Sequence, residues 1–317
     1  MKMLNKKEIR ILYLGTPEIS AVVLEKMILS GYNIVGVIAQ EDREKNRKKE
    51  LLPVPTKVIA QKYNIECYQP VKLNKETDIV TKLQPDLILT LAYGQIVSQT
   101  ILEIPQIGCL NLHGSLLPKY RGAAPIQYAL LNGDKVSGIT LMEMVKEMDA
   151  GRMFYKVEVP VEVKDNYTTL TNKLADAAFR CFDEGIEDII SGKNLGEVQD
   201  ESLVTFTSKI THDDEKIDFS MNSIDIINKM RALTMTPGVY FIYNDVKYKI
   251  FDMDLSKTAN VGKPGEVISY NKNSFEIATG DGSILIKSIQ KPGKKIISFK
   301  DFFNGERETF KVGDIII

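Results

Sequence analysis

The sequence predicts an α/β fold followed by a second, β-rich domain. Short apolar runs alternate with amphipathic segments through the first half of the chain, and short β-rich runs replace them after about residue 205. The chain has 317 residues, which is long for one compact core. We predict a mainly parallel sheet domain over residues 1–190, a linker over 191–206 and a small β-barrel over 207–317.

The first domain is built from apolar strands and intervening helices. Residues 11–14 read as a strand that ends at Gly15, and Thr16 and Pro17 are typical of a helix N-cap and first helical position. Further buried strands are expected at 34–39, 87–92 and 109–112, and helices at 56–63, 75–83 and 166–191. Strands that alternate with helices indicate a parallel sheet covered on both faces.

The second domain contains short strands separated by polar turns. We expect strands at 239–243, 248–251, 265–269, 274–279 and 284–288, with glycine-, proline- and asparagine-containing turns between them. Such closely spaced strands indicate a small β-barrel.

Composition narrows the class of protein. Apolar residues make up 44% and charged residues 26%, as in ordinary globular proteins. The net charge of −1 excludes a uniformly basic surface, so a nucleic acid would need local patches. Three distant cysteines without Cys-x-x-Cys spacing argue against disulfides and cysteine metal sites. No apolar run approaches the roughly 20 residues of a membrane span. We expect a soluble, cytoplasmic protein without a membrane partner.

A basic segment follows the second expected strand. Residues 41–50 contain Arg43, Lys45, Arg47, Lys48 and Lys49 and no apolar side chain. α/β proteins place functional loops at this edge of the sheet. A solvated surface loop is the alternative interpretation from charge alone.

The most informative segment runs from Asn111 to Pro118. It begins at the carboxyl end of an expected parallel strand, where α/β proteins bind ligands. Strand alternation points Asn111 and His113 to the same face. The segment lacks the Gly-x-Ser-x-Gly elbow, because Leu117 occupies the position of the second glycine, so Ser115 is not expected to be a nucleophile. His113 and His212 are far apart in the sequence and no metal-ligand spacing is present, so we expect no metal site.

The motif Asn-x-His-x-Ser-Leu-Leu-Pro, with a following Arg-Gly, resembles the signature of the 10-formyltetrahydrofolate-dependent formyltransferases. Met148-Asp149-Ala150-Gly151 is similar to the aspartate loop of that family. Segments along nearly the whole chain resemble the methionyl-tRNA formyltransferases in particular: Gly15-Thr16-Pro17, residues 122–126, Gln199-Asp200-Glu201, Gly280-Asp281-Gly282 and Pro292-Gly293-Lys294-Lys295. The resemblance implies a Rossmann-like first domain and a second domain like an oligonucleotide-binding (OB) fold.

The resemblance implies a catalytic set of Asn111, His113 and Asp149. Formyl transfer places negative charge on the formyl oxygen, and Asn111 and His113 would donate hydrogen bonds to it. Asp149, beside His113, would help to take the proton that the attacking amine loses. A turn aspartate is the alternative for Asp149 alone. The residues implied for folate contact are Tyr93, Gly94, Ser115, Leu116, Leu117 and Pro118.

The implied partners are 10-formyltetrahydrofolate, as formyl donor, and initiator methionyl-tRNA. The basic loop would contact tRNA phosphates through Arg43, Arg47 and Lys49, although Glu44-Lys45-Asn46 replaces the usual Pro-Ala-Gly of the family. Lysines of the second domain would follow the tRNA backbone: Lys247, Lys249, Lys291, Lys294 and Lys295. Scattered solvating lysines are the alternative. The chain also lacks the tryptophan that often precedes Pro237 in the family. We expect a monomer.

Three rival functions stay open at this point. The same fold could use a small acceptor, such as glycinamide ribonucleotide, an amino sugar nucleotide or water. A nicotinamide-dependent dehydrogenase is disfavoured, because residues 15–20 lack the Gly-x-Gly-x-x-Gly turn. A non-catalytic RNA-binding protein is disfavoured by the intact Asn111, His113 and Asp149.

Overall fold

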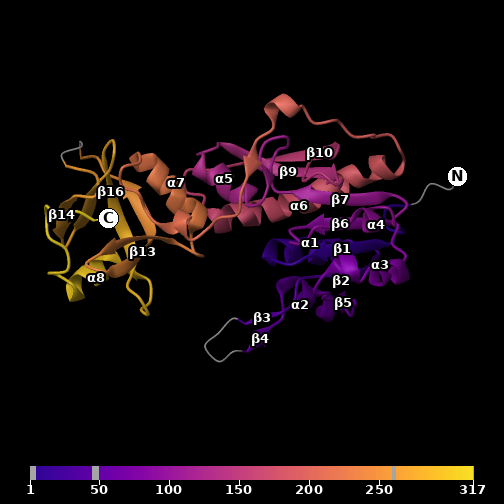
Figure 1. Cartoon of the computed structure of the whole chain (residues 1–317), viewed down its shortest axis with the longest axis horizontal. Coiled ribbons are helices and arrows are strands. Elements are labelled where there is room, and N and C mark those ends of the chain that lie inside the picture. Colours follow the sequence, from indigo (N-terminus) through magenta and orange to yellow (C-terminus); the bar gives the residue numbers. More distant parts are fainter. Residues whose placement is uncertain (1–4, 45–49, 259–261, 317) are drawn as a thin grey trace. The chain divides into compact units, whose positions relative to one another are not determined.

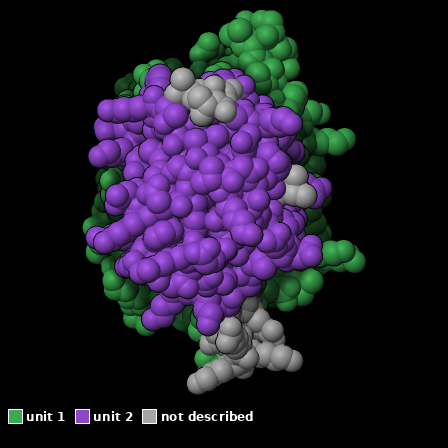
Figure 2. Space-filling model, turned by 90° about the vertical axis from the view of Figure 1, so that its left-hand side faces the viewer, with its two compact units in different colours: residues 1–125, 136–160, 171–207 green, residues 126–135, 161–170, 208–317 purple. Residues whose placement is uncertain are grey.

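The computed structural model describes residues 5–44, 50–258 and 262–316. Its contacts divide the chain into two compact units, coloured separately in Figure 2. Unit 1 contains residues 1–125, 136–160 and 171–207, and unit 2 contains residues 126–135, 161–170 and 208–317. Each unit is described below on its own.

Unit 1 contains a seven-stranded, mainly parallel sheet, which confirms the predicted α/β class. The strand order is β10-β9-β7-β6-β1-β2-β5 (Figure 1). The parallel strands are β1 (Ile11–Gly15), β2 (Ile34–Ile38), β5 (Cys67–Tyr68), β6 (Leu87–Leu91) and β7 (Gly108–His113). β1 and β6 are buried along their whole length, as expected for strands that are covered on both faces.

Helices cover both faces of this sheet. α1 (Glu18–Leu29), α2 (Pro55–Lys62) and α6 (Tyr167–Ile190) are neighbours on one side: the α1 and α2 helices pack together, and Lys26 of α1 pairs with Asp176 of α6 at 2.5 Å. The other side carries the shorter elements η1 (Leu73–Lys75), α3 (Asp78–Leu83) and α4 (Gln99–Leu102). The helix predicted at 75–83 is therefore shorter than expected and follows a separate 3-10 turn.

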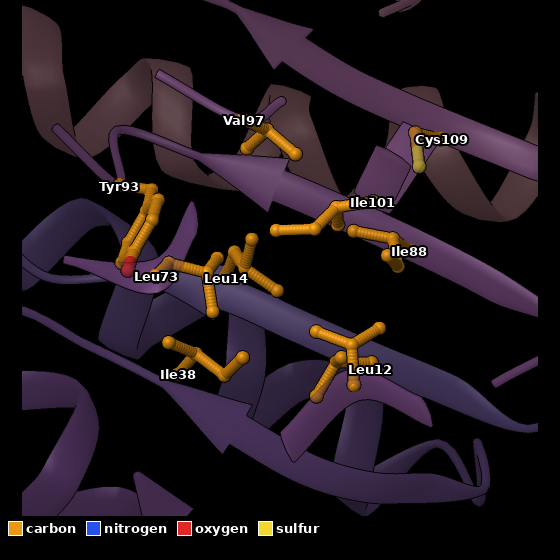
Figure 3. Packing of buried hydrophobic residues seen from close by; sticks show 10 residues of the cluster. Leu12, Leu14, Ile38, Leu73, Ile88, Tyr93, Val97, Ile101 and Cys109 are labelled. Atoms are coloured by element: carbon orange, nitrogen blue, oxygen red, sulfur yellow. The ribbon is translucent and has the colours of Figure 1, made fainter. Parts of the chain in front are cut away.

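An apolar cluster lies between the sheet and these shorter helices. Figure 3 shows Leu12 and Leu14 of β1 facing Ile101 of α4, with the Tyr93 ring at one end of the cluster. Val80 of α3 belongs to the same cluster and is fully buried. This packing fixes the carboxyl ends of β1 and β6, where the polar residues lie.

Thr16 does not cap α1. The N-cap is Pro17, and the Thr16 hydroxyl instead donates to the Tyr93 carbonyl oxygen at 3.1 Å and accepts from the Gln40 backbone N–H at 3.2 Å. The hydroxyl therefore joins the segments that follow β1, β2 and β6.

An antiparallel hairpin, which the sequence reasoning missed, extends the sheet beyond β7. β9 (Val136–Glu143) pairs with β7 and with β10 (Met153–Pro160), both in antiparallel orientation. His113 lies opposite Thr140, and Asn111 lies opposite Met142. β9 ends opposite Leu110, and Asp149, in the loop that joins β9 to β10, reaches back to His113 at the carboxyl end of β7.

Short strands and helices make up the remaining elements. β3 (Arg43–Glu44) pairs with β4 (Leu51–Leu52), and β8 (Arg121–Gly122) pairs with β11 (Phe206–Thr207). The remaining short helices are α5 (Pro125–Leu131), η2 (Glu201–Leu203) and η3 (Asp213–Glu215). The pairing of β8 with β11 holds the segment after α6 against unit 1.

Unit 2 contains an antiparallel sheet of order β12-β13-β16-β15-β14, with β17 on β16. Its strands are β12 (Val239–Tyr243), β13 (Val246–Leu255), β14 (Val267–Asn271), β15 (Ser274–Ala278), β16 (Ser283–Gln290) and β17 (Ile297–Ser298). Two helices accompany them, α7 (Ser223–Leu233) and α8 (Phe299–Gly305). Buried aromatic rings fill the core, with Phe310 stacked on Phe275 at 4.6 Å between centroids. The predicted β-rich second domain is confirmed.

The Gly280-Asp281-Gly282 turn supports the start of α7. Asp281 Oδ1 accepts from the Ser223 backbone N–H at 2.7 Å. A Cβ at Gly280 would come within 2.2 Å of the Ser220 carbonyl oxygen, so only glycine fits the close approach of these two segments.

Candidate active site

Asn111 extends from the carboxyl end of β7 with a fixed amide orientation. Its Oδ1 accepts a hydrogen bond of 2.8 Å from the Thr90 hydroxyl on β6. With Oδ1 bound by the Thr90 hydroxyl, the amide NH₂ group lies on the opposite side. The two N–H donors of Asn111 therefore face away from Thr90.

His113 follows on the same strand and is 6% exposed. Its Nε2 atom lies 2.8 Å from the Tyr120 carbonyl oxygen. A carbonyl oxygen only accepts hydrogen bonds, so Nε2 carries the proton and donates it to Tyr120. In the neutral ring the lone pair is then on Nδ1, which is the atom that faces Asp149.

Asp149 lies in the loop between β9 and β10. Its Oδ2 atom is 3.6 Å from His113 Nδ1 and accepts a hydrogen bond of 2.8 Å from the Gly122 backbone N–H. The backbone of Asp149 has φ +51°, a left-handed conformation that non-glycine residues seldom adopt. The structure thus brings Asn111, His113 and Asp149 to one edge of the sheet.

This arrangement combines a neutral donor, a proton acceptor and a carboxylate. Asn111 can donate to an oxygen that gains negative charge, which is the requirement of acyl transfer. His113 Nδ1 can accept a proton, and the adjacent Asp149 carboxylate can stabilise the resulting positive charge. The site therefore fits the attack of an amine on a carbonyl carbon.

The Ser115–Pro118 segment is packed against this site. The Ser115 hydroxyl donates to the Lys119 carbonyl oxygen at 2.6 Å, and its side chain is buried. Leu117 is 1% exposed and packs with Met142 and Met153, while Leu116 and Pro118 are half-buried. Leu116 and Pro118 are therefore the accessible members of this loop.

Tyr93 and Gly94 follow β6 at the same edge. The Tyr93 ring is buried in the apolar cluster of Figure 3, and burial raises the pKa of its hydroxyl. That hydroxyl has no hydrogen-bond partner among the described residues. Gly94 has φ +90° and lies beside the Gln40 side chain.

The basic segment emerges from a small hairpin. Arg43 lies on β3, whereas Arg47 and Lys49 lie outside the described residues. Asp42 at the base of the hairpin is held by Lys57 Nζ at 2.5 Å and by Gln69 Nε2 at 2.7 Å. Burial acts to raise the pKa of the Asp42 carboxyl, but the Lys57 and Gln69 hydrogen bonds outweigh it and hold the pKa below its usual value.

The five lysines predicted to bind tRNA differ in their surroundings. Lys247 lies 3.7 Å from Glu215 and 3.6 Å from the Tyr240 ring centroid. Lys249 donates to the Pro237 carbonyl oxygen at 2.5 Å, and Lys291 pairs with Glu306 at 2.6 Å. Lys294 and Lys295 are exposed in the loop between β16 and β17. The exposed pair offers the more accessible charge.

Two further features concern the described part of the chain. Residues 5–44, 50–258 and 262–316 contain no cluster of three or more histidine, cysteine, aspartate or glutamate side chains that could hold a metal ion. Among the helices in those ranges, none is long and apolar enough to cross a bilayer.

Sequence reasoning did not identify the supporting residues of the site. Thr90 orients Asn111, Tyr120 orients His113, and the Gly122 N–H contacts Asp149. Gly122 has φ +108°, and a Cβ there would come within 2.5 Å of the Thr207 carbonyl oxygen. The Arg121-Gly122 pair in the motif was the sequence feature that could have indicated a role for Gly122.

Two family models match the chain. The model described as "Formyl transferase" matches residues 7–185, which is more than half of the 317 residues. The model described as "Formyl transferase, C-terminal domain" matches residues 209–307.

Several solved structures share this fold. HypX from Aquifex aeolicus in complex with tetrahydrofolic acid is 17% identical, with a TM-score of 0.65, over 98% of this chain and 50% of HypX. This chain thus spans about half the length of HypX. WlaRD, a sugar 3N-formyl transferase solved with dTDP and 5-N-formyl-THF, is 22% identical, with a TM-score of 0.65, over 90% of this chain and 99% of WlaRD.

An N-formyltransferase from Helicobacter canadensis, in complex with folinic acid and dTDP-3-aminofucose, is 20% identical, with a TM-score of 0.66, over 89% of this chain and 99% of that protein. At these identities the structures show a common fold. The longer family match, over residues 7–185, includes Asn111, His113 and Asp149. The chain therefore belongs to the formyl transferase family.

Proposed function

We propose that this formyltransferase transfers the formyl group of 10-formyltetrahydrofolate to the α-amino group of initiator methionyl-tRNA. The observation that carries the chemistry is the meeting of Asn111, His113 and Asp149 at the carboxyl end of β7, with the Asn111 NH₂ group turned away from Thr90. The product would be N-formylmethionyl-tRNA, used in translation initiation in the cytoplasm.

The proposed reaction assigns each group one role. The neutral amine attacks the formyl carbon, a carbon–nitrogen bond forms, and the formyl oxygen becomes an oxyanion that the Asn111 NH₂ group stabilises. The amine loses a proton to His113 Nδ1, next to the Asp149 carboxylate. The bond to N10 then breaks as the oxyanion collapses, and N10 takes up the proton from His113.

The donor assignment rests on the family and on the surroundings of the site. HypX and WlaRD were solved with tetrahydrofolic acid and 5-N-formyl-THF, respectively. Leu116 and Pro118 offer half-buried apolar surface in the loop that follows His113, and such surface suits a flat ring system. The unpartnered hydroxyl of Tyr93 is a buried polar group at the same sheet edge.

The acceptor assignment rests on the second unit and on the basic hairpin. A tRNA acceptor needs positive charge along its backbone, which a small acceptor does not need. Asp42, an acidic residue of the hairpin, is neutralised by Lys57, which leaves the basic residues of that segment in excess. Lys294 and Lys295 provide exposed positive charge in unit 2.

The test is transfer of labelled formyl from 10-formyltetrahydrofolate, with methionyl-tRNA, free methionine plus uncharged tRNA, and a dTDP-amino sugar offered in parallel. We expect product with methionyl-tRNA alone. Transfer only to the amino sugar, a compound of the kind bound in the H. canadensis structure, would contradict the tRNA assignment and leave the catalytic set in place.

The catalytic set is tested by Asn111→Ala. Loss of one oxyanion donor should lower kcat by about 100- to 1000-fold. Asn194→Ala is the matched control, because the Asn194 amide donates to the Phe154 carbonyl oxygen and does not contact the site residues. Undiminished turnover by Asn111→Ala would contradict the proposed mechanism.

A further inference from the structure

Gln199 is a buried amide whose polar atoms all have partners in unit 1. It lies between α6 and η2 and is 4% exposed. Its Nε2 donates to the Asp149 carbonyl oxygen at 2.7 Å and to the Gly151 carbonyl oxygen at 2.8 Å. Its Oε1 accepts from Arg121 Nε at 2.9 Å. One side chain therefore binds both carbonyl groups that flank Ala150.

Arg121 fixes which way this amide points. Its guanidinium is buried and can only donate, so the oxygen of Gln199 must face it and the NH₂ group must face the loop. Arg121 is itself held by Glu201, with NH2 to Oε1 at 2.7 Å and NH1 to Oε2 at 3.3 Å. Glu201, Arg121 and Gln199 form a chain of contacts that ends on the Asp149 backbone.

The loop that Gln199 holds needs such support. Asp149 has φ +51°, a conformation that persists only when the surrounding structure holds it, and the side chain of Gln199 binds the Asp149 carbonyl oxygen. Within the loop the Ala150 N–H contacts the Glu147 carbonyl oxygen only at 3.4 Å. The carboxylate of Asp149 must nevertheless stay 2.8 Å from the Gly122 N–H and 3.6 Å from His113 Nδ1.

We propose that Gln199 is a positioning residue that holds the Asp149 carboxylate against His113 through the two backbone carbonyls. The inference rests on the proposed role of Asp149 in formyl transfer. The proposal gives a function to the Gln199-Asp200-Glu201 segment. Gln199 binds the loop directly, and Glu201 holds the Arg121 guanidinium that orients Gln199.

Gln199→Leu keeps the size of the side chain and removes its three hydrogen bonds. We expect kcat to fall by about 10- to 100-fold with little change in KM for the folate donor, because displacement of a catalytic group affects the chemical step. Gln199→Glu replaces the NH₂ group with a carboxylate oxygen that faces two carbonyl oxygens, so it should lose as much activity while it keeps the Arg121 contact. Wild-type kcat in folded Gln199→Leu would overturn the proposal.

A double-mutant cycle separates positioning from general destabilisation. If Gln199 acts through Asp149, then Gln199→Leu should add little to the loss already caused by Asp149→Asn. Losses that multiply in the double variant would overturn the proposal. If Asp149→Asn alone retains full activity, the proposed catalytic set fails, whatever Gln199 does.

Hydrogen exchange tests the support without any acceptor. The Gly122 N–H donates to the Asp149 carboxylate, so Gln199→Leu should raise exchange in peptides that cover 119–124 and 145–152. Gly305→Ala, at a position where a Cβ meets no atom within 4 Å, should leave both peptides unchanged. Equal protection of these peptides in Gln199→Leu and wild type would overturn the proposal even if methionyl-tRNA proves not to be the acceptor.

Discussion

Gly151→Ala tests how closely activity depends on the position of the Asp149 loop. An alanine Cβ at this position would lie 2.0 Å from the Glu143 carbonyl oxygen and 2.8 Å from its carbonyl carbon, whereas real Cβ atoms stay beyond 3.0 Å. Both obstructing atoms are backbone atoms of β9, which is held in the sheet on both sides. Relief of the clash therefore requires the loop to move away from β9 by about 1 Å, and a misplacement of that size costs about 100-fold in rate.

The assay is steady-state formylation together with thermal unfolding. We expect kcat/KM to fall by about 100-fold, with most of the loss in kcat, because the loop carries the carboxylate next to His113. Gly305→Ala is the control, since a Cβ there meets no atom within 4 Å. A folded Gly151→Ala protein whose kcat/KM stays within about threefold of wild type would refute the reasoning that loop position limits the reaction.

Three further variants test the core, a helix start and the tRNA surface. Phe182→Ala should lower the free energy of unfolding by about 3–5 kcal/mol in urea titration, because the ring is fully buried against Tyr32. A loss of less than about 1 kcal/mol would show that Phe182 is not packed as described. The hydrogen bond from the Ser223 N–H holds the pKa of the Asp281 carboxyl below its usual value. The stability that the Asp281 carboxylate contributes is therefore fully present above the unfolded-state pKa, and it is lost as the pH falls through the lower, folded-state pKa. Asp281→Asn should therefore lower Tm at pH 7 and differ less from wild type below about pH 4, whereas an equal difference at both pH values would contradict this origin. The double variant Lys294→Glu/Lys295→Glu should weaken methionyl-tRNA binding and reduce the salt dependence of the binding constant, while kcat at saturating tRNA stays unchanged. An unaltered salt dependence would show that these lysines do not contact the tRNA.

The elements that sequence reasoning found are those with an uninterrupted local signal. β1 begins with a continuous apolar run, β6 is interrupted only by Thr90, and α6 keeps helical spacing over its whole length, so each was predicted within a few residues. β9 was missed because Ser137, Gly138 and Thr140 interrupt its apolar pattern. All three residues are buried in the fold, and a Cβ at Gly138 would lie 2.4 Å from the Val157 carbonyl oxygen. Polar and small residues that are selected by tertiary contact weaken the pattern on which a strand prediction depends.

The same distinction applies to the site. Asn111 and His113 share a strand, so alternation alone predicts that they share a face. Their relation to Asp149 came from resemblance, because the hairpin that returns the chain to β7 leaves no spacing rule in the sequence.

Sequence reasoning did not identify Thr90, and it noted Gln199 only within the Gln199-Asp200-Glu201 resemblance, without a role. Thr90 acts through a hydrogen bond to Asn111, and Gln199 acts through hydrogen bonds to Asp149, Gly151 and Arg121. No spacing rule links a strand threonine or a linker glutamine to partners so far along the chain. Reactive side chains are constrained by the chemistry that they perform, so residue type and local spacing are informative about them. Their supports are constrained only by the distance that they must span and the donor or acceptor that they must present. Chemistry can therefore be inferred from a motif, whereas the precision that makes the motif active has to be read from the contacts around it.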